Sequence, residues 1–245
     1  MKEYKSKDEL LIGKTILVTG AGDGIGKTLA IESAKLGAKV ILLGKTVSKL
    51  ESVYDSIEAL NKAQASIVPL DLEGATEQNY IDLADTIKRE YGHLDGLVHN
   101  ASQLGILGPF EQIQEKIWQK VMQVNVNAAF LLTKSLLPLL KEAPHASIIF
   151  STSGVGNKGR AYWGAYCVSK FATEGMMQLL ADEYENSSLR FNAINPGATR
   201  TAMRANAYPA EDKNTLKTAL DILPSYLYLL GDDSINIQGQ RINAQ

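Results

Sequence analysis

The chain has 245 residues, of which 45% are apolar and 21% charged, and its formal net charge is −2. This composition is typical of a soluble globular protein and is sufficient for one large α/β domain. The chain has no excess of basic residues that would indicate nucleic acid or an anionic membrane as a partner.

Short apolar runs alternate with helical patterns almost to the end of the chain. The predicted strands are 15–19, 40–43, 66–70, 94–99, 147–150 and 189–194, with a candidate seventh strand at 235–243. The predicted helices are 25–36, 47–61, 77–91, 110–140 with an interruption near Asn125, 161–185, and short irregular helices over 200–230. The strands lack polar alternation, so both of their faces should be buried. We therefore predict one domain over 1–245, a three-layer α/β structure with a doubly wound parallel sheet of about seven strands.

Two further features of the sequence bear on the cellular compartment of the protein. Cys167 is the only cysteine, which excludes an intrachain disulfide, and its simplest role is a packed side chain. The first 14 residues have no apolar signal core, and the longest apolar run, 128–140, is interrupted by Lys134 and Pro138. We expect a cytoplasmic protein with no membrane partner.

A glycine-rich loop, TGAGDGIG (19–26), follows the first predicted strand. At Gly20, Gly24 and Gly26, a tight turn and absent Cβ atoms would let a pyrophosphate approach the backbone. The helix that begins near Ile25 would present free N–H groups to it. Between a first strand and a first helix the loop predicts a dinucleotide site, although a glycine cluster alone is also compatible with a plain turn.

The end of the second strand distinguishes the two nicotinamide cofactors. NAD-binding chains hold an acidic residue there for the ribose 2′-hydroxyl, whereas this chain has Gly44 and then Lys45. The cation favours the 2′-phosphate of NADP(H). Asp23 in the glycine loop argues for NAD(H), which stays possible, and Lys45 as a plain surface lysine is the alternative interpretation.

Polar residues also follow the third and fourth strands. Asp71 could accept a hydrogen bond from the adenine amino group, or serve as a turn or N-cap residue. Asn100 ends the fourth strand, at the edge where parallel sheets bind ligands, or else ties neighbouring strands together.

Tyr166 and Lys170 are four residues apart and share one face of a predicted helix. A free phenol has a pKa near 10, and an ammonium about 4 Å away contributes roughly 4 kcal/mol at an effective dielectric constant of about 20. That interaction would lower the pKa of the phenol toward about 7, which suits a general acid–base. Most pairs with this spacing are ordinary surface pairs, so the interpretation depends on neighbouring residues.

Ser153 and Asn125 supply that context. Ser153 comes just after the fifth strand, where it could donate a hydrogen bond to a substrate carbonyl. Asn125 lies inside the long helical stretch, where its amide could perturb the helix and hold a water against Lys170. Each residue alone is compatible with a loop, cap or kink, but together behind a glycine loop they predict a catalytic site.

The chain resembles the short-chain dehydrogenase/reductase family, in its single-domain Rossmann-fold form. The resemblance covers nearly the whole chain and rests on TGAGDGIG, LDL (70–72), HNAS (99–102), QVNVNAAF (123–130), Ser153, YCVSK (166–170) and NPGATRT (195–201). It implies hydride transfer between nicotinamide and a small carbonyl or alcohol substrate. It also implies that Tyr166 is the acid–base, Lys170 binds the nicotinamide ribose, Ser153 orients the substrate and Asn125 completes a proton relay.

The same resemblance implies the cofactor contacts and no metal site. The expected cofactor-binding residues are Gly20, Asp23, Gly24, Ile25, Gly26, Lys45, Asp71, Leu72, Asn100, Ala101, Ser102, Tyr166, Lys170, Pro196, Gly197, Thr199 and Thr201. Ser102 stands where the family usually has a glycine, so we expect the backbone geometry at this position to differ from that of the family. His99 replaces an asparagine, and we expect it to be a packed strand residue. Several longer runs resemble an uncharacterised bacterial oxidoreductase.

The substrate cover is predicted at about 199–220, a polar and irregular segment typical of a mobile lid. Arg200 and Arg204 are four residues apart and could hold a carboxylate or phosphate, or could simply be solvated. The helices over 113–137 and 161–185 are apolar on more than one side, which indicates a homodimer or homotetramer, or else a larger core.

These features predict an NADP(H)-dependent oxidoreductase acting on a carbonyl/alcohol pair. Two alternatives stay open. One is a 3-oxoacyl-thioester reductase, in which the two arginines would meet an acidic acyl carrier. The other is a cofactor-binding regulatory protein without turnover, which the presence of Ser153, Tyr166 and Lys170 disfavours.

Overall fold

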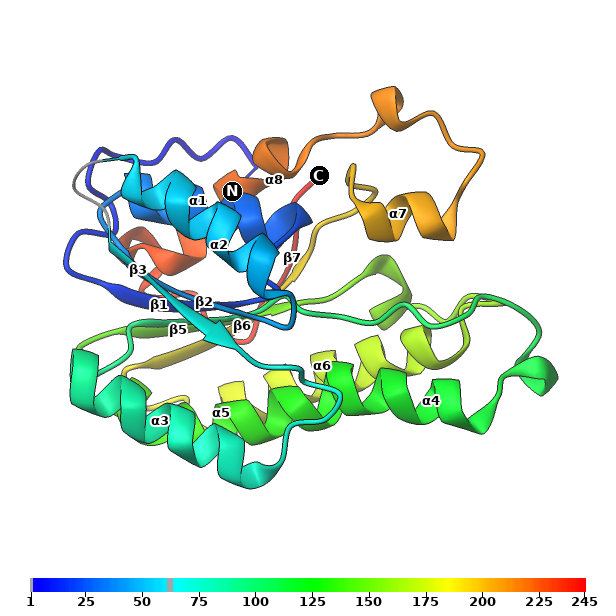
Figure 1. Ribbon diagram of the computed structural model, residues 1–245, viewed down its shortest axis with the longest axis horizontal. Helices are drawn as coiled ribbons and strands as arrows, with labels where there is room; N and C mark the ends of the chain where they lie inside the picture. The colour runs from blue at the N-terminus through cyan, green and yellow to red at the C-terminus, as the bar shows by residue number, and fades with distance from the viewer. Residues whose placement is uncertain (1, 61–63) are drawn as a thin grey trace.

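The computed structural model describes residues 2–60 and 64–245, and its centre is a parallel sheet between two layers of helices (Figure 1). The strands are β1 (Thr15–Thr19), β2 (Lys39–Gly44), β3 (Gln64–Pro69), β4 (Gly96–His99), β5 (Ala146–Ser151), β6 (Leu189–Asn195) and β7 (Arg241–Asn243). Their spatial order is β3-β2-β1-β4-β5-β6-β7, and every neighbouring pair is parallel. The predicted doubly wound sheet is confirmed.

The helices divide between the two faces of this sheet. They are α1 (Gly24–Lys35), α2 (Val47–Glu58), α3 (Glu77–Tyr91), α4 (Glu115–Met122), α5 (Ala128–Lys141), α6 (Gly164–Glu183), α7 (Ala202–Ala207) and α8 (Ala219–Leu230). Helices α1, α2 and α8 cover one face, and α3, α5 and α6 cover the other (Figure 1).

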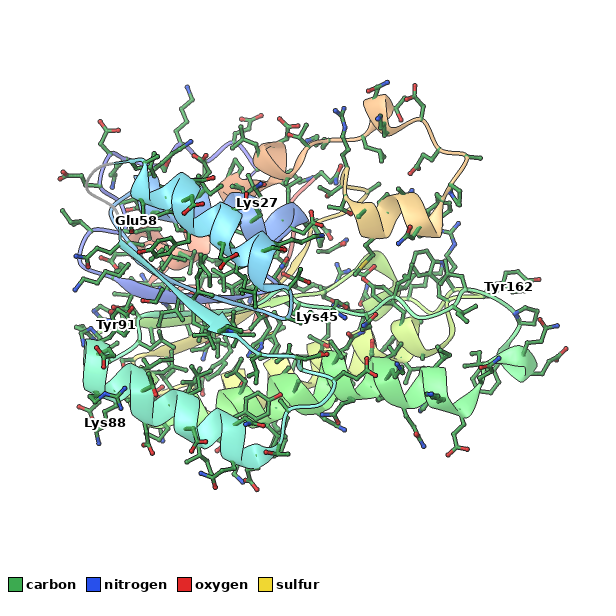
Figure 2. All side chains as sticks on the ribbon, in the orientation of Figure 1. Lys27, Lys45, Glu58, Lys88, Tyr91 and Tyr162 are labelled. Atoms are coloured by element: carbon green, nitrogen blue, oxygen red, sulfur yellow. The ribbon has the colours of Figure 1, made fainter. Side chains whose placement is uncertain are left out.

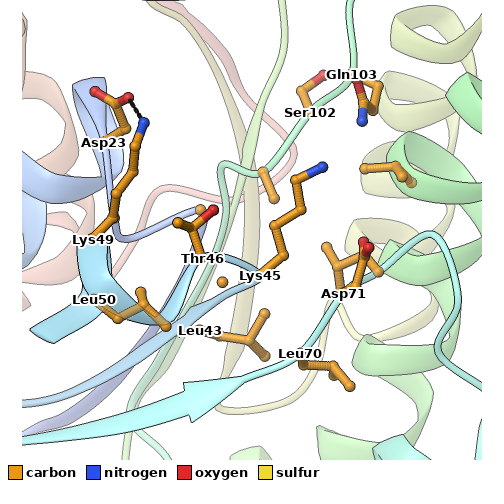
Figure 3. A pocket seen from close by; sticks show the side chains of 16 residues that line it. Asp23, Leu43, Lys45, Thr46, Lys49, Leu50, Leu70, Asp71, Ser102 and Gln103 are labelled. Atoms are coloured by element: carbon orange, nitrogen blue, oxygen red, sulfur yellow. Dashed lines mark hydrogen bonds and ion pairs between the residues drawn. The ribbon is translucent and has the colours of Figure 1, made fainter.

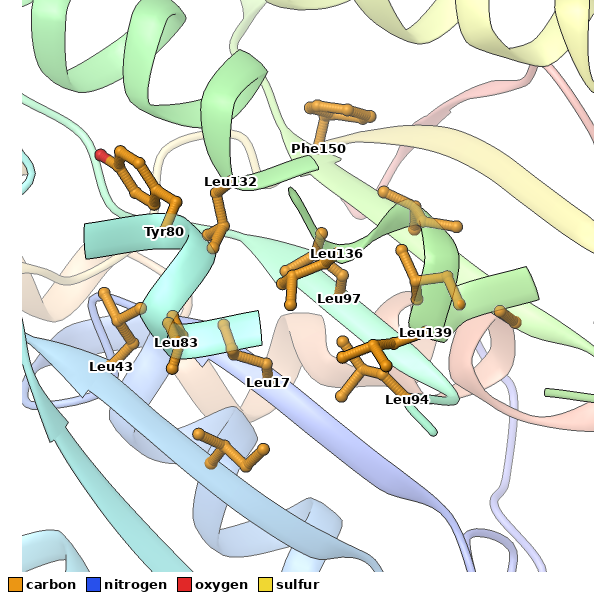
Figure 4. Packing of buried hydrophobic residues seen from close by; sticks show 14 of the residues in the cluster. Leu17, Leu43, Tyr80, Leu83, Leu94, Leu97, Leu132, Leu136, Leu139 and Phe150 are labelled. Carbon is orange, nitrogen blue, oxygen red and sulfur yellow. The ribbon is translucent and has the colours of Figure 1, made fainter. Parts of the chain in front are cut away.

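Each face has its own hydrophobic core, because successive side chains of a strand point to opposite sides. In β1, Leu17 packs toward α3 and α5, whereas Ile16 and Val18 pack toward α1 and α8. Figure 4 shows Leu17 and Leu97 of the sheet with the leucines of α5, among them Leu136. Burial on both faces explains why the strands read as continuous apolar runs.

Three elements differ from the sequence-based expectation. Helix α2 ends at Glu58 rather than near 61, and Asn61 itself lies outside the described residues. Helix α8 is a regular helix of 12 residues, whereas only short irregular helices were expected. Strand β7 spans three residues, because Ile235 still caps a 3₁₀ turn over Asp232–Ser234 and a left-handed Gly239 (φ 66°) interrupts the predicted strand just before β7.

A π-helical turn, Gln123–Asn127, joins α4 to α5 and confirms the predicted interruption near Asn125. Such turns carry an extra residue inside a helix and are frequent at functional sites. Within residues 2–60 and 64–245, no helix has both the length and the apolar character needed to cross a membrane.

The chain reverses its winding direction between β1 and β4, which are neighbours in the sheet. The connections from these two strands therefore leave toward opposite faces and open a crevice at their carboxyl ends. The glycine loop, Lys45, Asn100 and Ser153 each come just after a strand, so they lie at this carboxyl edge of the sheet.

Candidate active site

The glycine loop follows β1 and leads into α1. Gly20 has φ 66°, a left-handed conformation that favours glycine. A Cβ atom on Gly26 would lie 2.3 Å from the carbonyl oxygen of Gly20, so any larger residue would push the loop from the helix. The two glycines therefore set the tight strand-to-helix turn that the motif predicts.

Asp23 occupies the N-cap of α1, and an ion pair at the protein surface compensates its charge. Its carboxylate accepts a hydrogen bond from the Gly24 N–H (2.7 Å) and from the Lys49 ammonium (2.5 Å), the contact drawn in Figure 3. The Lys49 hydrogen bond holds the pKa of Asp23 below its usual value. The argument that Asp23 would repel a 2′-phosphate is thus weakened, because an ion pair offsets its charge.

A first cavity of about 270 Å³ lies over the carboxyl ends of β1 and β2. Lys45, directly after β2, extends across this cavity toward Ser102 (Figure 3). Asp71 also lines it, and its carboxylate accepts a hydrogen bond from the Glu73 N–H (3.1 Å), which makes it a turn residue as well. The N-cap of α3 is Thr76, so Asp71 is not the cap.

A second cavity of about 250 Å³ adjoins the first. The two share Gly20, Asp23, Ala101 and Ser102, so they form one groove along the edge of the sheet. Of these two cavities, Leu72 lines only the first. The second is also lined by Gly24, Ile25, Asn100, Tyr166, Lys170, Pro196 and Thr201.

Two polar side chains of this groove differ in their hydrogen bonding: Asn100 is bonded within the protein, whereas Ser102 is not. Asn100 ties β4 to β1, because its amide donates to the Thr19 carbonyl oxygen (3.1 Å). The Ser102 hydroxyl is buried and has no hydrogen-bond partner among the described residues. A buried unpaired hydroxyl is costly, so this position suits a ligand that accepts or donates a hydrogen bond there.

Helix α6 brings Tyr166 and Lys170 to the inner end of the second cavity. Both are buried, with 7% and 4% of their surface exposed. The Lys170 ammonium donates to the Ser151 carbonyl oxygen at the end of β5 (2.7 Å) and lies 5.4 Å from the centre of the Tyr166 ring. The predicted shared helix face is therefore present.

The direction of the Tyr166 pKa shift is opposite to the sequence-based expectation. Burial raises the pKa of the Tyr166 phenol to about 12, and only its hydrogen bond with Ser153 opposes the shift. Burial also lowers the pKa of Lys170 to about 8, although Glu174 opposes that change. The spacing argument included the charge of the lysine but not the loss of water around both groups.

Ser153 lies in the loop after β5 and lines a further cavity together with Tyr166. Its position depends on a buried network that the sequence did not indicate. The Glu174 carboxylate, 5% exposed, accepts hydrogen bonds from Thr152 Oγ1 (2.6 Å) and Arg241 Nε (2.9 Å). Arg241 in turn donates to the Ser153 carbonyl oxygen (3.0 Å). Glu174 is one further helical turn beyond Lys170, which was the available signal.

Asn125 is buried but its amide is not directed at Lys170. Its Oδ1 accepts from the Gln103 N–H (2.7 Å), and its Nδ2 donates to the Gln103 carbonyl oxygen and to Ser169 Oγ (both 2.9 Å). Asn125 and Lys170 do line one small enclosed cavity of about 10 Å³. That volume is close to the minimum for a single water.

Three expected cofactor-binding residues lie outside the two groove cavities. Gly26 packs under the loop, as described above. Gly197 and Thr199 line the adjoining cavities on the far side of Tyr166 instead. The Thr199 hydroxyl is buried and donates to the Pro196 carbonyl oxygen (3.2 Å), so its first role is to hold the turn after β6.

The predicted arginine pair does not form a joint anion site. Arg200 donates from Nε to the Lys213 carbonyl oxygen (2.8 Å) and is directed away from the cavities. Arg204 does line them, but it makes a two-point ion pair with Glu211 (2.6 Å for each contact). The four-residue spacing failed here because Arg200 precedes α7, whose N-cap is Thr201.

His99 is a packed strand residue, as predicted. It stacks on Phe150 (4.8 Å between ring centres) and its Nε2 shares a hydrogen bond with Thr133 Oγ1 (2.8 Å). Burial, together with the nearby Lys170, lowers the pKa of His99 to about 3, so the ring is neutral at physiological pH. Cys167 is buried as well, with its thiol directed at the Val155 carbonyl oxygen.

Comparisons with known proteins agree with this geometry. A family model described as short chain dehydrogenase matches residues 14–212. The uncharacterised oxidoreductase YciK of Escherichia coli (strain K12) is 52% identical over 242 residues, which are 99% of this chain and 96% of YciK.

Two solved structures extend the comparison to bound cofactor. A short chain dehydrogenase from Shigella flexneri 2a, in complex with NADP, is 51% identical with a TM-score of 0.96, covering 98% of this chain and 100% of that one. One from Escherichia coli CFT073, in complex with NADPH, is 52% identical with a TM-score of 0.94, covering 98% and 99% of the two chains.

Proposed function

Because the chain belongs to the short-chain dehydrogenase family, we propose that it is an NADP(H)-dependent oxidoreductase that interconverts a carbonyl compound and its alcohol. One observation carries the proposal: Tyr166 and Lys170 lie at the inner end of a groove built on the glycine loop, and Ser153 lines the adjoining cavity together with Tyr166. The hydroxyls of Tyr166 and Ser153, at the end of a groove that can hold a dinucleotide, suit a reaction that couples hydride transfer to proton transfer.

The residues of the groove fit NADP(H). The glycine loop gives the diphosphate access to the backbone, and Ser102 offers an unpaired hydroxyl between the two cavities. Lys45 faces the first cavity where an NAD-binding chain would place an acid, and Lys49 compensates Asp23. The reports of NADP and NADPH in two similar structures support the same cofactor.

The bound nicotinamide would supply the hydride, and the protein's side chains would manage the proton. With its pKa raised to about 12, Tyr166 is protonated at neutral pH and is ready to donate to a carbonyl oxygen. Ser153 would hold that oxygen. Lys170, 5.4 Å from the ring, would stabilise the phenolate as it forms. The small cavity shared by Asn125 and Lys170 supports a water-borne return of the proton.

The decisive experiment measures NADPH oxidation at 340 nm on a panel of aldehydes and ketones, for the wild type and Tyr166→Phe. We expect the variant to lose about 10²- to 10⁴-fold in kcat, the usual contribution of a positioned acid–base, with NADPH binding retained. Tyr162→Phe is the matched control, since Tyr162 is exposed on the surface near this site, and it should keep activity.

Two results would contradict the proposal. Wild-type turnover that survives Tyr166→Phe would remove the assigned acid. NADPH binding by wild type without turnover on the whole panel would favour the regulatory interpretation. The acyl-carrier alternative has lost its specific support, because Arg204 is paired with Glu211 and Arg200 with backbone carbonyls.

We further propose that the protein acts as a homo-oligomer. Large apolar side chains are exposed on two adjacent helices: Phe130 on α5, and Val168, Phe171 and Leu179 on α6. An exposed apolar surface of this kind is typical of an interface between copies. Sedimentation velocity would test this, and a monomer at micromolar concentration would contradict it.

A further inference from the structure

Beyond Tyr166 the groove continues into two further cavities, which extend past the residues expected to bind the cofactor. A cavity of about 110 Å³ is lined by both Tyr166 and Ser153, and it shares Ser153, Trp163 and Arg204 with a larger one of about 540 Å³. A substrate whose carbonyl sits at Tyr166 and Ser153 would extend the rest of its body into this larger cavity. We call the larger one the outer cavity.

The charge of the outer cavity is one-sided. Lys158 and Arg160 contribute to its wall from the segment 157–163, and Arg204 contributes from α7. None of the described residues lining the outer cavity is an aspartate or a glutamate. Arg204 is compensated by Glu211, which lies outside that wall. The uncompensated positive charge therefore comes from Lys158 and Arg160.

Neither of these two side chains has an ion-pair or hydrogen-bond partner within residues 2–60 and 64–245, and both are exposed. Two unpaired cations on one wall of a cavity repel each other and favour an anion between them. A guanidinium and an ammonium also match carboxylate and phosphate oxygens through charge-assisted hydrogen bonds. Trp163 supplies an apolar surface beside them for the carbon skeleton.

We propose that the substrate is a small carbonyl compound bearing an anionic group, a carboxylate or a phosphate, which Lys158 and Arg160 bind in the outer cavity. This inference rests on the proposed function for the position of the carbonyl. It assigns specificity to two residues of the 157–163 segment, rather than to the arginine pair that the sequence suggested.

The test uses two aldehydes that differ in charge: 4-carboxybenzaldehyde and its methyl ester, methyl 4-formylbenzoate. For the wild type, kcat/KM for the acid should exceed that for the ester by about tenfold, the effect expected of two partly solvated charge contacts. In Lys158→Gln/Arg160→Gln the ratio should fall to near one, chiefly through the KM of the acid. Lys88→Gln, at the opposite end of the molecule from Tyr162 (Figure 2), should keep the wild-type ratio.

A binding measurement separates this inference from the proposed function. Calorimetry on the NADPH-loaded protein would compare 4-carboxybenzyl alcohol with its methyl ester, a pair that cannot turn over with reduced cofactor. Tighter binding of the acid that disappears in the double variant would support the anion site even if no aldehyde is reduced.

Two outcomes would overturn it. One is a wild type that treats acid and ester alike in both assays. The other is a double variant that loses activity but keeps the wild-type ratio, since this would indicate a structural role for the two residues. If the wild type prefers the acid, sugar phosphates with a free carbonyl, run with and without the phosphate, distinguish a phosphate from a carboxylate requirement.

Discussion

The two walls that meet at Tyr166 are built on opposite principles. The inner wall, formed by α6 and the end of β5, is almost dry: Lys170 and Glu174 are at most 5% exposed, and each has defined hydrogen-bond partners. The outer wall, formed by 157–163 and α7, is exposed, and Lys158 and Arg160 stay unpaired among the described residues. Proton transfer needs a fixed environment, whereas recognition of a charged ligand needs cations that are free to bind it.

The largest effect on stability is expected from removing the Glu174 carboxylate, which is buried in the inner wall. Glu174→Ala leaves Arg241 and Thr152 without their partner, and breaking a buried ion pair costs about 3 to 5 kcal/mol in free energy of unfolding. Urea denaturation would measure this loss, and kcat should fall as well because Ser153 loses its support. The matched control is Glu183→Ala on the exposed side of the same helix, expected to change stability by under about 0.5 kcal/mol.

A second effect, of intermediate size, tests how well water is excluded behind the inner wall, where His99 of β4 stacks on Phe150 of β5. His99 is neutral in the fold because burial lowers its pKa to about 3, whereas in the unfolded chain it titrates near 6.5. Unfolding therefore takes up a proton below pH 6.5, so the stability that His99 provides is complete above that pH and is lost as pH falls toward 3. Between pH 7 and pH 5 the loss amounts to about 2 kcal/mol.

The measurement compares the wild type with His99→Gln, whose amide does not titrate. The difference between their free energies of unfolding should shrink by that amount from pH 7 to pH 5. A constant difference for His99→Gln would mean that water reaches this histidine, and the contrast between the walls would break.

The smallest expected effect concerns the far end of the groove. Lys45→Gln should raise the KM for NADPH about tenfold, since one charge-assisted contact to the 2′-phosphate is lost, while the KM for NADH stays unchanged. Steady-state kinetics with both cofactors measure this, with Lys88→Gln as control. An equal rise for both cofactors would show that Lys45 contacts something common to them.

The sequence predicted the sheet, the groove and the helix face of the tyrosine, because each depends on local pattern. Runs of β-branched residues and a glycine loop between a strand and a helix are local signals, and a four-residue spacing is one wherever the helix that it presumes is formed. The spacing could not predict the pKa of Tyr166, since that depends on the water that α6 excludes when it packs against β5.

The remaining misses have several physical origins, of which contacts between residues distant in the chain are the first. Arg241 reaches Glu174 across 67 positions, and no periodicity links them. Arg204 forms its ion pair with Glu211 because the chain after α7 turns back toward that helix, which residue spacing does not indicate. Lys158 and Arg160 lie in an irregular loop, where the only available signal was their place between the serine and the tyrosine. Helix α8 was missed because Pro224 lies within it, although a Thr218–Asp221 capping box begins it.

Every functional group described above lies at the carboxyl edge of a sheet whose strands all run in the same direction. The opposite edge, where short turns such as 144–145 and 186–188 enter β5 and β6, contributes to none of the four cavities of the groove. A fluorescent label or an immobilisation linker attached at His145 or Asn186, both exposed, would therefore leave turnover intact. The protein could therefore be attached through the amino edge of its sheet while the groove at the carboxyl edge stays open to ligands.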